Sequence, residues 1–543
     1  MRIVECVPNI SEGRRPEVYN AIAHAAEVPG VKLLDVDPGQ ETNRTVITFV
    51  GEPEAVLAGA FQLVKASFEL IDMRQHQGAH ARQGATDVCP FVPVAGVTMD
   101  DCVELARRLG DRVGRELRVP VYLYEHAATR PERRSLAAIR KGEYEALAEE
   151  LKTAEFEPDF GPAEFVPSFG AMVTGARAFL VAYNVDLNVA DKRWANRVAF
   201  DVREKGRTVK GPDGREVEQP GMLKAVRGVG WYIPEYGCAQ VSMNLVDLEV
   251  TPLHAAFDAC EESARRRGMR VTGSELVGLV PKRCMLEAGR HYLKRMERSA
   301  GVPEADLVHT AIRSLGLDDV APFDPKEKII EELLARPRPL AALTLEGFAD
   351  ETSRDSAAPG GGSVAALGGA LGAALAAMVA NLAHPKGAHA EVRDQLEEIA
   401  VRGQELKQRL LDAIDEDTWS FEALMEANRS SGSGKAERVR AATLGAARVP
   451  LEVLEACPRI VELCRRAVEL GMAASASDAG VGAAMARAAA VGAAMNVRIN
   501  LQAIEGDPEA AELLARARRT LAETVERAGQ VEAEVWAKLG WGD

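Results

Sequence analysis

The strand-like run "RAFLVAYNVDL", Arg177–Leu187, decides how the first half of this chain is divided. It follows the Pro- and Gly-containing stretch "EFEPDFGPAEFVPSFG" (155–170). Before these residues, strand-like stretches such as "RTVITFVG" alternate with helical stretches such as "MDDCVELARRLGDRVGREL". The same alternation starts again at Arg177. We therefore predict two α/β subdomains, at residues 1–176 and 177–326.

The remainder of the chain has a different composition. Beyond Thr344 strand-like runs almost vanish, and Ala, Leu, Glu and Arg recur at helical spacing, as in "ELLARARRTLAETVERAGQVEAEVWAKL". Pro337 and Pro339 lie just before this change and favour a linker over residues 327–343. The sequence thus predicts two α/β subdomains followed by an all-α helical-bundle domain at 344–543. A chain of 543 residues is long enough for several cores.

Charge and cysteine content exclude several classes of protein. The net charge is −15 and no long Lys/Arg tract occurs, which argues against a nucleic-acid partner. The eight cysteines include no CxxC pair, which is typical of reduced thiols in a cytosolic protein. The first residues, "MRIVECVPNISEG", do not resemble a secretory signal. The most apolar stretch, 365–383, is so rich in Ala and Gly that it favours close helix packing over a membrane span. We expect a cytoplasmic protein without a membrane partner.

The segment "QHQGAHARQGATDVCPF" (75–91) has three interpretations. His76 and His80 are spaced to bind zinc from one face of a helix, but Gly78 and Gly84 argue against a regular helix, and no third ligand lies nearby. We therefore expect no metal. Both imidazoles can instead be solvated loop groups, or His80 can act as a general base, because a pKa of about 6.5 suits proton transfer at neutral pH.

The helical half contains one glycine-rich turn and one acidic cluster. "APGGGSVAA" lacks the GK[ST] ending of a phosphate loop, so we predict a tight turn with Ser363 capping the next helix. In "DEDTWSF" (415–421) a carboxylate is a candidate acid/base, and Asp415 and Asp417 lie two positions apart, so they point to different helical faces. The alternative is an exposed acidic turn. Ser477 and Asp478 either cap the following helix or line a site.

Several long motifs resemble known families. The segments at 4–13, 33–51, 76–94, 159–187 and 273–281 are similar to the glutamate formiminotransferase family, and those at 356–379, 415–421 and 475–501 are similar to formimidoyltetrahydrofolate cyclodeaminase. Both occur in this order in the bifunctional formiminotransferase-cyclodeaminase family, and the resemblance covers essentially the whole chain. It implies transfer of the formimino group of N-formimino-L-glutamate to tetrahydrofolate, then cyclisation to 5,10-methenyltetrahydrofolate with release of ammonia.

The resemblance also implies roles for single residues. It places the catalytic histidine at His80, within H-x-R-x-G, and an acidic group that orients the imidazole or stabilises the amidinium at Asp37. Arg44 is expected to bind a substrate carboxylate, and Asp417 is the catalytic aspartate of cyclisation. Without the resemblance, Asp37 reads as a turn or cap residue and Arg44 as part of a surface salt bridge.

A continuous segment is implied to bind folate in a groove between the two α/β subdomains. Its backbone would meet the pterin edges, and Phe165 and Phe169 would give flat apolar contact. The alternative is an interdomain linker with core phenylalanines. The segment comprises Gly161, Pro162, Ala163, Glu164, Phe165, Val166, Pro167, Ser168, Phe169 and Gly170.

The expected partners are therefore small molecules, namely formiminoglutamate and tetrahydrofolate polyglutamate as co-substrate. We also expect a homo-oligomer built from dimers, since the small-residue helix faces should pair. Two other functions stay open: a transferase alone, with the helical domain as a dimerisation module, and a non-catalytic folate-binding assembly protein.

Overall fold

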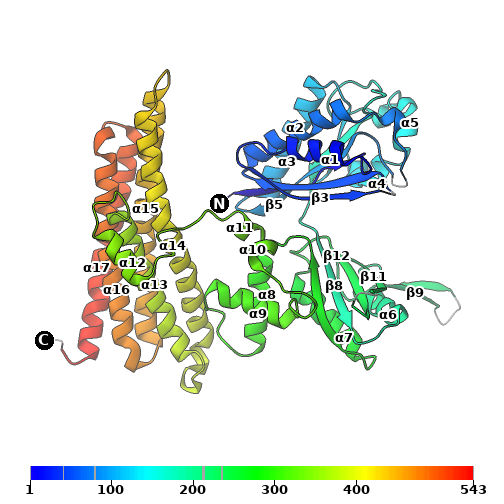
Figure 1. Cartoon of the computed structure of the whole chain (residues 1–543). Coiled ribbons are helices and arrows are strands. Elements are labelled where there is room, and N and C mark those ends of the chain that lie inside the picture. The colour runs from blue at the N-terminus through cyan, green and yellow to red at the C-terminus, as the bar shows by residue number, and fades with distance from the viewer. Residues whose placement is uncertain (1, 41, 79–80, 211–214, 234–235, 542–543) are drawn as a thin grey trace. The chain divides into compact units, whose positions relative to one another are not determined.

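The computed structural model describes residues 2–40, 42–78, 81–210, 215–233 and 236–541. The chain forms two compact units, which are treated separately below: Met1–Cys284 with Leu315–Leu334, and Met285–Ser314 with Ala335–Asp543. The first unit holds two sheets with helices and the second is all-helical, as Figure 1 shows. The predicted fold class is confirmed.

The N-terminal sheet is mixed. In its antiparallel part, β4 pairs with β3 on one side and with the two short strands β1 and β2 on the other. β1 and β2 each pair with β5, also antiparallel. β5, β7 and β6 then continue in parallel. The strands are β1 (Ile3–Cys6), β2 (Asn9–Ile10), β3 (Val31–Gly39), β4 (Arg44–Gly51), β5 (Thr86–Ala95), β6 (Val121–Glu125) and β7 (Met172–Ala176).

Helices cover this sheet unequally. The larger core joins one sheet face to α1 (Pro16–Ala25), α2 (Pro53–Leu70) and α3 (Met99–Glu116). A smaller cluster on the other face packs α4 (Leu136–Ile139) and α5 (Glu143–Glu150) over β5, β6 and β7 only.

The second sheet is antiparallel, in the order β11-β12-β8-β13, with α6 and α7 on one face. β9 and β10 form a separate hairpin. The elements are β8 (Val181–Leu187), α6 (Lys192–Val202), β9 (Arg207–Lys210), β10 (Glu216–Gln219), β11 (Val226–Ile233), β12 (Cys238–Leu245), α7 (Leu253–Arg265) and β13 (Val271–Val277).

The chain passes between the two units more than once. α8 (Lys282–Arg295) and α9 (Glu304–Leu315) belong largely to the second unit, where Asn381 Nδ2 donates a hydrogen bond to Gly301 O at 2.7 Å. α10 (Pro325–Lys328) and α11 (Ile330–Leu333) return to the first unit. The stretch predicted as a linker therefore begins with two short helical turns.

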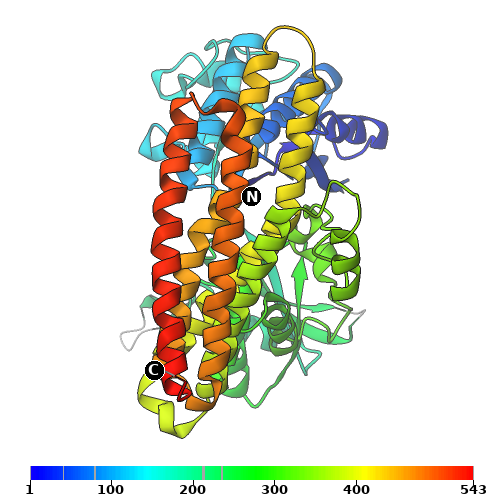
Figure 2. The ribbon, with the colours of Figure 1, turned by 90° about the vertical axis from the view of Figure 1, so that its left-hand side faces the viewer.

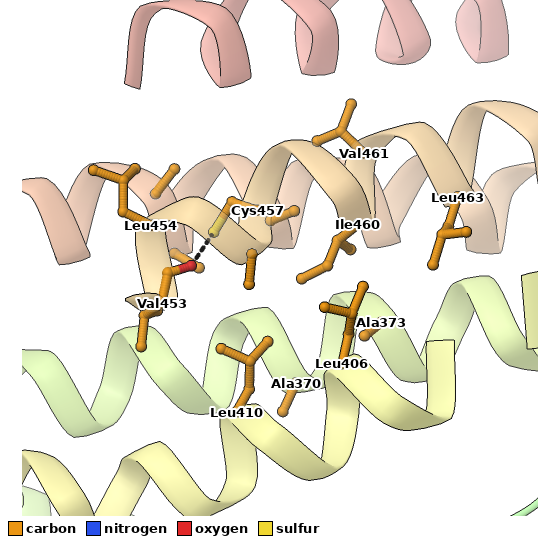
Figure 3. Packing of buried hydrophobic residues seen from close by; sticks show 14 of the residues in the cluster. Ala370, Ala373, Leu406, Leu410, Val453, Leu454, Cys457, Ile460, Val461 and Leu463 are labelled. Atoms are coloured by element: carbon orange, nitrogen blue, oxygen red, sulfur yellow. Dashed lines mark hydrogen bonds between the residues drawn. The ribbon is translucent and has the colours of Figure 1, made fainter. Parts of the chain in front are cut away.

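Five long helices build the bundle, and they run alongside one another in Figure 2. α13 contributes mainly Ala and Gly to the core, so its neighbours approach closely. Figure 3 shows Ala370 and Ala373 against Leu406 and Leu410 of α14, with Ile460 of α15 nearby. The five long helices are α13 (Gly361–Ala383), α14 (Arg393–Arg429), α15 (Lys435–Leu470), α16 (Ala476–Leu501) and α17 (Pro508–Lys538), and the short α12 (Leu345–Thr352) precedes them.

Two helical segments of the bundle, Gly361–Ala383 and Ala473–Ile504, are long and apolar enough to cross a membrane by length and composition alone. In the fold, 61% and 44% of the residues in their most apolar stretches are buried. Core helices of soluble proteins meet the same criterion, and packing accounts for much of the apolar character of both segments.

Candidate active sites

His76 follows α2 and precedes β5 in the chain. The structure assigns it a structural role. His76 Nε2 lies 2.8 Å from Asn43 O, and Arg82 Nε donates to His76 Nδ1 at 3.2 Å. The Arg82 donor occupies the Nδ1 lone pair, so the proton sits on Nε2. Burial lowers the pKa of His76, and the Arg82 charge lowers it further. A neutral imidazole with both nitrogens engaged is not available as a base. His80 lies outside the described residues.

Arg82 of the H-x-R-x-G motif is held by the start of α5. Its guanidinium donates to both carboxylate oxygens of Glu145, at 2.8 and 2.6 Å, and to Glu143 at 3.2 Å. The main-chain N–H of Tyr144 donates to Arg82 O at 2.8 Å. A cavity of about 670 Å³ opens between residues 141–145 on one side and residues 73–78 with Arg82 on the other. The first turn of α5 thus fixes one wall of that cavity.

The predicted substrate-binding residue Arg44 is part of a buried polar cluster. Its guanidinium donates to Asn9 Oδ1 at 2.7 and 3.0 Å and to Asp87, a side chain with no exposed surface. Arg140 also donates to Asp87, as does the main-chain N–H of Gln83 at 2.9 Å. Arg44 is therefore not part of a surface salt bridge, which was the alternative interpretation.

Asp37 lies on the edge strand β3 and is exposed. It is paired with Val46, so its side chain is on the same sheet face as Arg44, in a diagonal position. Within the described ranges its carboxylate has no hydrogen bond or ion pair. The structure therefore places Asp37 near the Arg44 cluster, free to meet a ligand, and not as a helix cap.

The predicted folate segment lies beside the histidine segment. Gly170 forms a bridge with Gly84, and Ala171 N donates to Gln83 O at 3.1 Å. Gly170 has a φ of +82°, and a Cβ there would overlap Gln83 O, so only glycine fits this close approach. Tyr144 OH also reaches Pro167 O at 2.5 Å. The fold thus brings two motifs about 80 residues apart in sequence into direct contact.

The two phenylalanines of the folate segment differ. Phe169 is fully buried in the core of the N-terminal sheet, with its ring centre 5.7 Å from that of Phe68. It is a core residue and gives no flat surface to a ligand, contrary to the expectation from sequence. Phe165 is half-buried and lies against Tyr144, with ring centres 5.4 Å apart. Any aromatic contact to a pterin from this segment falls to Phe165.

In the bundle, Asp417 of α14 faces the glycine turn that begins α13. A Cβ at Gly362 would overlap the Asp417 carboxyl group, so glycine is required for this approach. Ser363 Oγ lies 2.9 Å from Ile414 O and 3.3 Å from Asp417 Oδ2. α13 begins at Gly361 with Gly360 as its N-cap. The prediction that Ser363 caps this helix was wrong, because its hydroxyl bonds across to α14 instead.

Burial raises the pKa of Asp417, and the hydrogen bonds from Ser363 partly offset the rise. A carboxyl group in this environment retains its proton at a higher pH than a solvated aspartate does. It is suited to take and return a proton. Asp417 is therefore not an exposed acidic turn residue, which was the alternative interpretation.

Asp415 has a different function. Its carboxylate accepts hydrogen bonds from Leu340 N at 2.9 Å and Ala341 N at 3.0 Å, and it is 1% exposed. It anchors the segment before α12 and does not face Gly362. Ser477 is exposed and Asp478 lies in the first turn of α16, while Ser475 occupies the N-cap position without a side-chain cap bond. Neither Ser477 nor Asp478 is the N-cap.

Within residues 2–541, apart from the undescribed gaps, no three His, Cys, Asp or Glu side chains gather as ligands for a metal ion. The eight cysteines are free thiols.

The sequence matches three family profiles in succession. They are the formiminotransferase domain, N-terminal subdomain (residues 3–177), the formiminotransferase domain (182–335) and formiminotransferase-cyclodeaminase (344–520). Formimidoyltransferase-cyclodeaminase of Mus musculus is 44% identical over 516 residues, which span 93% of this chain and 94% of the mouse protein. This chain belongs to the formiminotransferase-cyclodeaminase family.

Shorter proteins resemble parts of this family member. Glutamate formimidoyltransferase of Streptococcus pyogenes serotype M1 is 40% identical over 294 residues, covering 54% of this chain and 94% of that protein. The crystal structure of a formiminotetrahydrofolate cyclodeaminase from Thermotoga maritima covers 37% of this chain and 98% of its own, with 28% identity and a TM-score of 0.35.

Three residues of the candidate transferase site were missed from sequence. Asp87 had a signal, because it is a charged residue in the apolar strand sequence "TDVCPFVPV". Arg140 and Glu145 had none, since both lie in an ordinary polar stretch and are recruited only by the folding of α4 and α5 onto the sheet.

Proposed function

We propose that this chain is a bifunctional enzyme that transfers the formimino group of N-formimino-L-glutamate to tetrahydrofolate and then cyclises 5-formiminotetrahydrofolate to 5,10-methenyltetrahydrofolate, releasing ammonia. The observation that carries this proposal is the similarity to formimidoyltransferase-cyclodeaminases along nearly the whole chain. These reactions belong to histidine degradation and one-carbon folate metabolism.

In the transferase step, N5 of tetrahydrofolate attacks the formimino carbon and loses its proton as the tetrahedral intermediate forms. We assign His80 as the base that takes this proton and returns it to the departing glutamate nitrogen. The engagement of both His76 nitrogens supports this choice between the two histidines. Asp37 and Arg44 are proposed to contact the amidinium and a carboxylate of the donor, and residues 161–170 to hold the folate.

In the cyclisation step, N10 attacks the same carbon and ammonia leaves. Asp417 is proposed to accept the N10 proton and to donate a proton to the amino group of the intermediate, which then leaves as ammonia. Its burial against Gly362 and its bond with Ser363 support this role. The raised pKa of Asp417 favours such a proton exchange over that of a solvated aspartate.

The test is to supply formiminoglutamate and tetrahydrofolate, and to follow glutamate release and the methenyl-folate absorbance together. His80→Ala should lose glutamate release. Asp417→Ala should release glutamate without forming the methenyl product. Glutamate release without methenyl formation by the unaltered protein would mean a transferase with a helical assembly domain. Neither reaction, with folate affinity retained, would mean a non-catalytic folate-binding protein.

We also propose a homo-oligomer built from dimers, with the apolar face of α13 and α16 covered by a second copy. The two helices pack side by side and expose apolar side chains at about heptad spacing along α13. The exposed residues are Val364, Leu371, Met378 and Leu382 on α13 and Val481, Met495 and Ile499 on α16.

Light scattering tests this assembly. Leu371→Glu should lower the molar mass, whereas the control Val525→Glu on α17, where an apolar side chain is similarly exposed, should not. An unchanged mass in Leu371→Glu would contradict the proposed dimer face.

For its surroundings we propose the cytoplasm, with tetrahydrofolate polyglutamate as co-substrate and neither nucleic acid nor membrane as partner. The net charge of −15 and the eight free thiols support this proposal. Cell fractionation tests it, and recovery of the chain in the membrane fraction would contradict it.

A further inference from the structure

The Asp87 cluster carries more positive than negative charge. Arg44 and Arg140 both donate to the same carboxylate, and their side chains are only 12% and 11% exposed. Among the residues that the structure describes, Asp87 is the only carboxylate that bonds either guanidinium. The remaining partner of Arg44 is the neutral amide of Asn9. Two cations with little solvent exposure therefore share one buried anion.

Such an arrangement is costly without a further anion. Removing charges from water is unfavourable unless opposite charges and hydrogen bonds compensate for the lost hydration. Burial lowers the pKa of Arg140, and the neighbouring Arg44 lowers it further. The charge of Asp87 opposes this lowering, and the Arg44 effect shows that a second cation lies close to Arg140. A bound carboxylate would compensate the second cation through the guanidinium N–H groups that Asp87 and Asn9 leave free.

The cluster is anchored to both sides of the segment that carries His80. On one side, Gly78 packs against Thr42 O and His76 bonds to Asn43 O, immediately before Arg44. On the other side, Gln83 N donates to Asp87, and Gln83 Nε2 donates to Ile139 O at 2.7 Å, immediately before Arg140.

The covalent chain limits how far His80 is from this cluster. Gln83 follows His80 by three positions, and three residues span at most about 11 Å. That span is comparable to the length of an extended glutamate side chain with a group on its nitrogen. His80 is therefore joined by a short stretch of chain to Gln83, whose main-chain N–H bonds to Asp87 of this cluster.

We propose that Arg44 and Arg140 together form the site for a substrate carboxylate, and that Arg140 is a specificity-determining residue of the transferase reaction. The inference rests on the proposed transferase function. Two molecules can supply the carboxylate: formiminoglutamate itself, or the glutamyl group of the folate. The short chain distance from His80 favours the donor.

The test compares Arg140→Met with unaltered protein in steady-state glutamate release. Loss of a charge-assisted pair of bonds should raise KM for formiminoglutamate about ten- to a hundredfold. The KM for tetrahydrofolate should stay within about twofold, and Arg140→Lys should restore only part of the loss because a lysine cannot form two parallel bonds.

Arg133→Met is the matched control. Arg133 is also buried, at 5% exposure, but it has its own partner Asp159 at 2.7 Å and lies in the same stretch of chain. Its removal should lower stability without changing KM for the donor. Equal changes of both Michaelis constants, or a fall in kcat alone, in Arg140→Met would overturn the proposal and leave Arg140 a structural residue.

Two further experiments are needed. The first distinguishes the two sources of the carboxylate, and the second tests the binding site if the proposed transferase function is wrong. If the Arg140→Met loss appears in KM for tetrahydrofolate and disappears with tetrahydropteroate, which lacks the glutamyl group, the carboxylate belongs to folate. If the unaltered protein shows no turnover, calorimetry with glutarate decides: binding that Arg140→Met abolishes and Arg133→Met keeps supports the site without the transferase. Glutarate binding that is equal in all three proteins contradicts it.

Discussion

The hydroxyl group of Ser363, in the first turn of α13, lies 3.3 Å from Oδ2 of Asp417, in the middle of α14. This contact joins the glycine turn to the candidate catalytic carboxylate and lowers the pKa of Asp417 against the larger effect of burial.

Removing that hydroxyl should shift the pH dependence of cyclisation. Ser363→Ala deletes a bond that favours the ionised carboxylate, so the pKa of Asp417 should rise further. If the carboxylate form is the active base, activity on 5-formiminotetrahydrofolate should fall at a higher pH than in the unaltered protein as the pH is lowered. Single-turnover rates from pH 5 to 9 measure this. Ser420→Ala is the control, because its hydroxyl bonds only to Asp417 O in the main chain. An unshifted acid limb would contradict the proton-transfer role of Asp417.

A methyl group at Gly362 should disable cyclisation selectively. Its Cβ would overlap the Asp417 carboxyl group, so Gly362→Ala must displace that carboxylate. A displacement of about 1 Å can cost about a hundredfold in rate. The transferase reaction in the same preparation is the internal control. Gly387→Ala, where a Cβ meets nothing within 4 Å, should behave as the unaltered protein does. Full methenyl formation by Gly362→Ala would show that this contact does not matter.

Loosening Arg82 should slow the transferase. Glu145→Gln removes the charge of the main partner of Arg82, and the arginine in turn donates to His76. Because Glu145 is largely exposed, water screens its ion pair with Arg82 and the effect of the substitution should be modest. We expect kcat for glutamate release to fall about threefold to tenfold. Glu149→Gln on the same helix, whose partner Lys152 is exposed, serves as the comparison. Equal rates in both variants would mean that α5 does not position the histidine segment.

Glu5 should make the first unit less stable at higher pH. Burial raises the pKa of Glu5 to about 7, an effect that Arg177 partly offsets, and the side chain is 6% exposed. A folded-state pKa above the unfolded value means that the folded chain binds the proton more tightly. Stability should therefore fall as the pH rises from about 4.5 to about 7, by at most about 3 kcal/mol in total, and then level off.

Glu5→Gln removes this titration. The variant should unfold at a higher temperature than the unaltered protein at pH 8 and at nearly the same temperature at pH 5. Glu54→Gln is the control, since Glu54 pairs with Arg108 at the surface and its pKa is lowered. A difference between Glu5→Gln and the unaltered protein that is as large at pH 5 as at pH 8 would contradict the raised pKa.

Local sequence identified both candidate motifs of the transferase half but not all of their partners. The segment 161–170 and the H-x-R-x-G motif were recognised as separate pieces, and the structure joins them through Gly84 and Gly170. Phe165 and Phe169 lie in similar sequence surroundings, but in the fold Phe165 is half-buried and Phe169 is fully buried in the core. Sequence spacing says nothing about such depth.

The sequence by itself determined the fold class, the family and the order of the two halves, because period-two and helical patterns are local and long motifs lie contiguous along the chain. The family resemblance of its motifs also singled out Asp417, and the two-position spacing puts Asp415 on a different helical face. Only the tertiary structure decided that His76 is engaged at both nitrogens, that Ser363 bonds to Asp417 and that Arg140 joins Arg44 at Asp87. Each of these pairs comes from elements that meet only when helices pack on the sheet or on one another, and burial then fixes which charges must be shared.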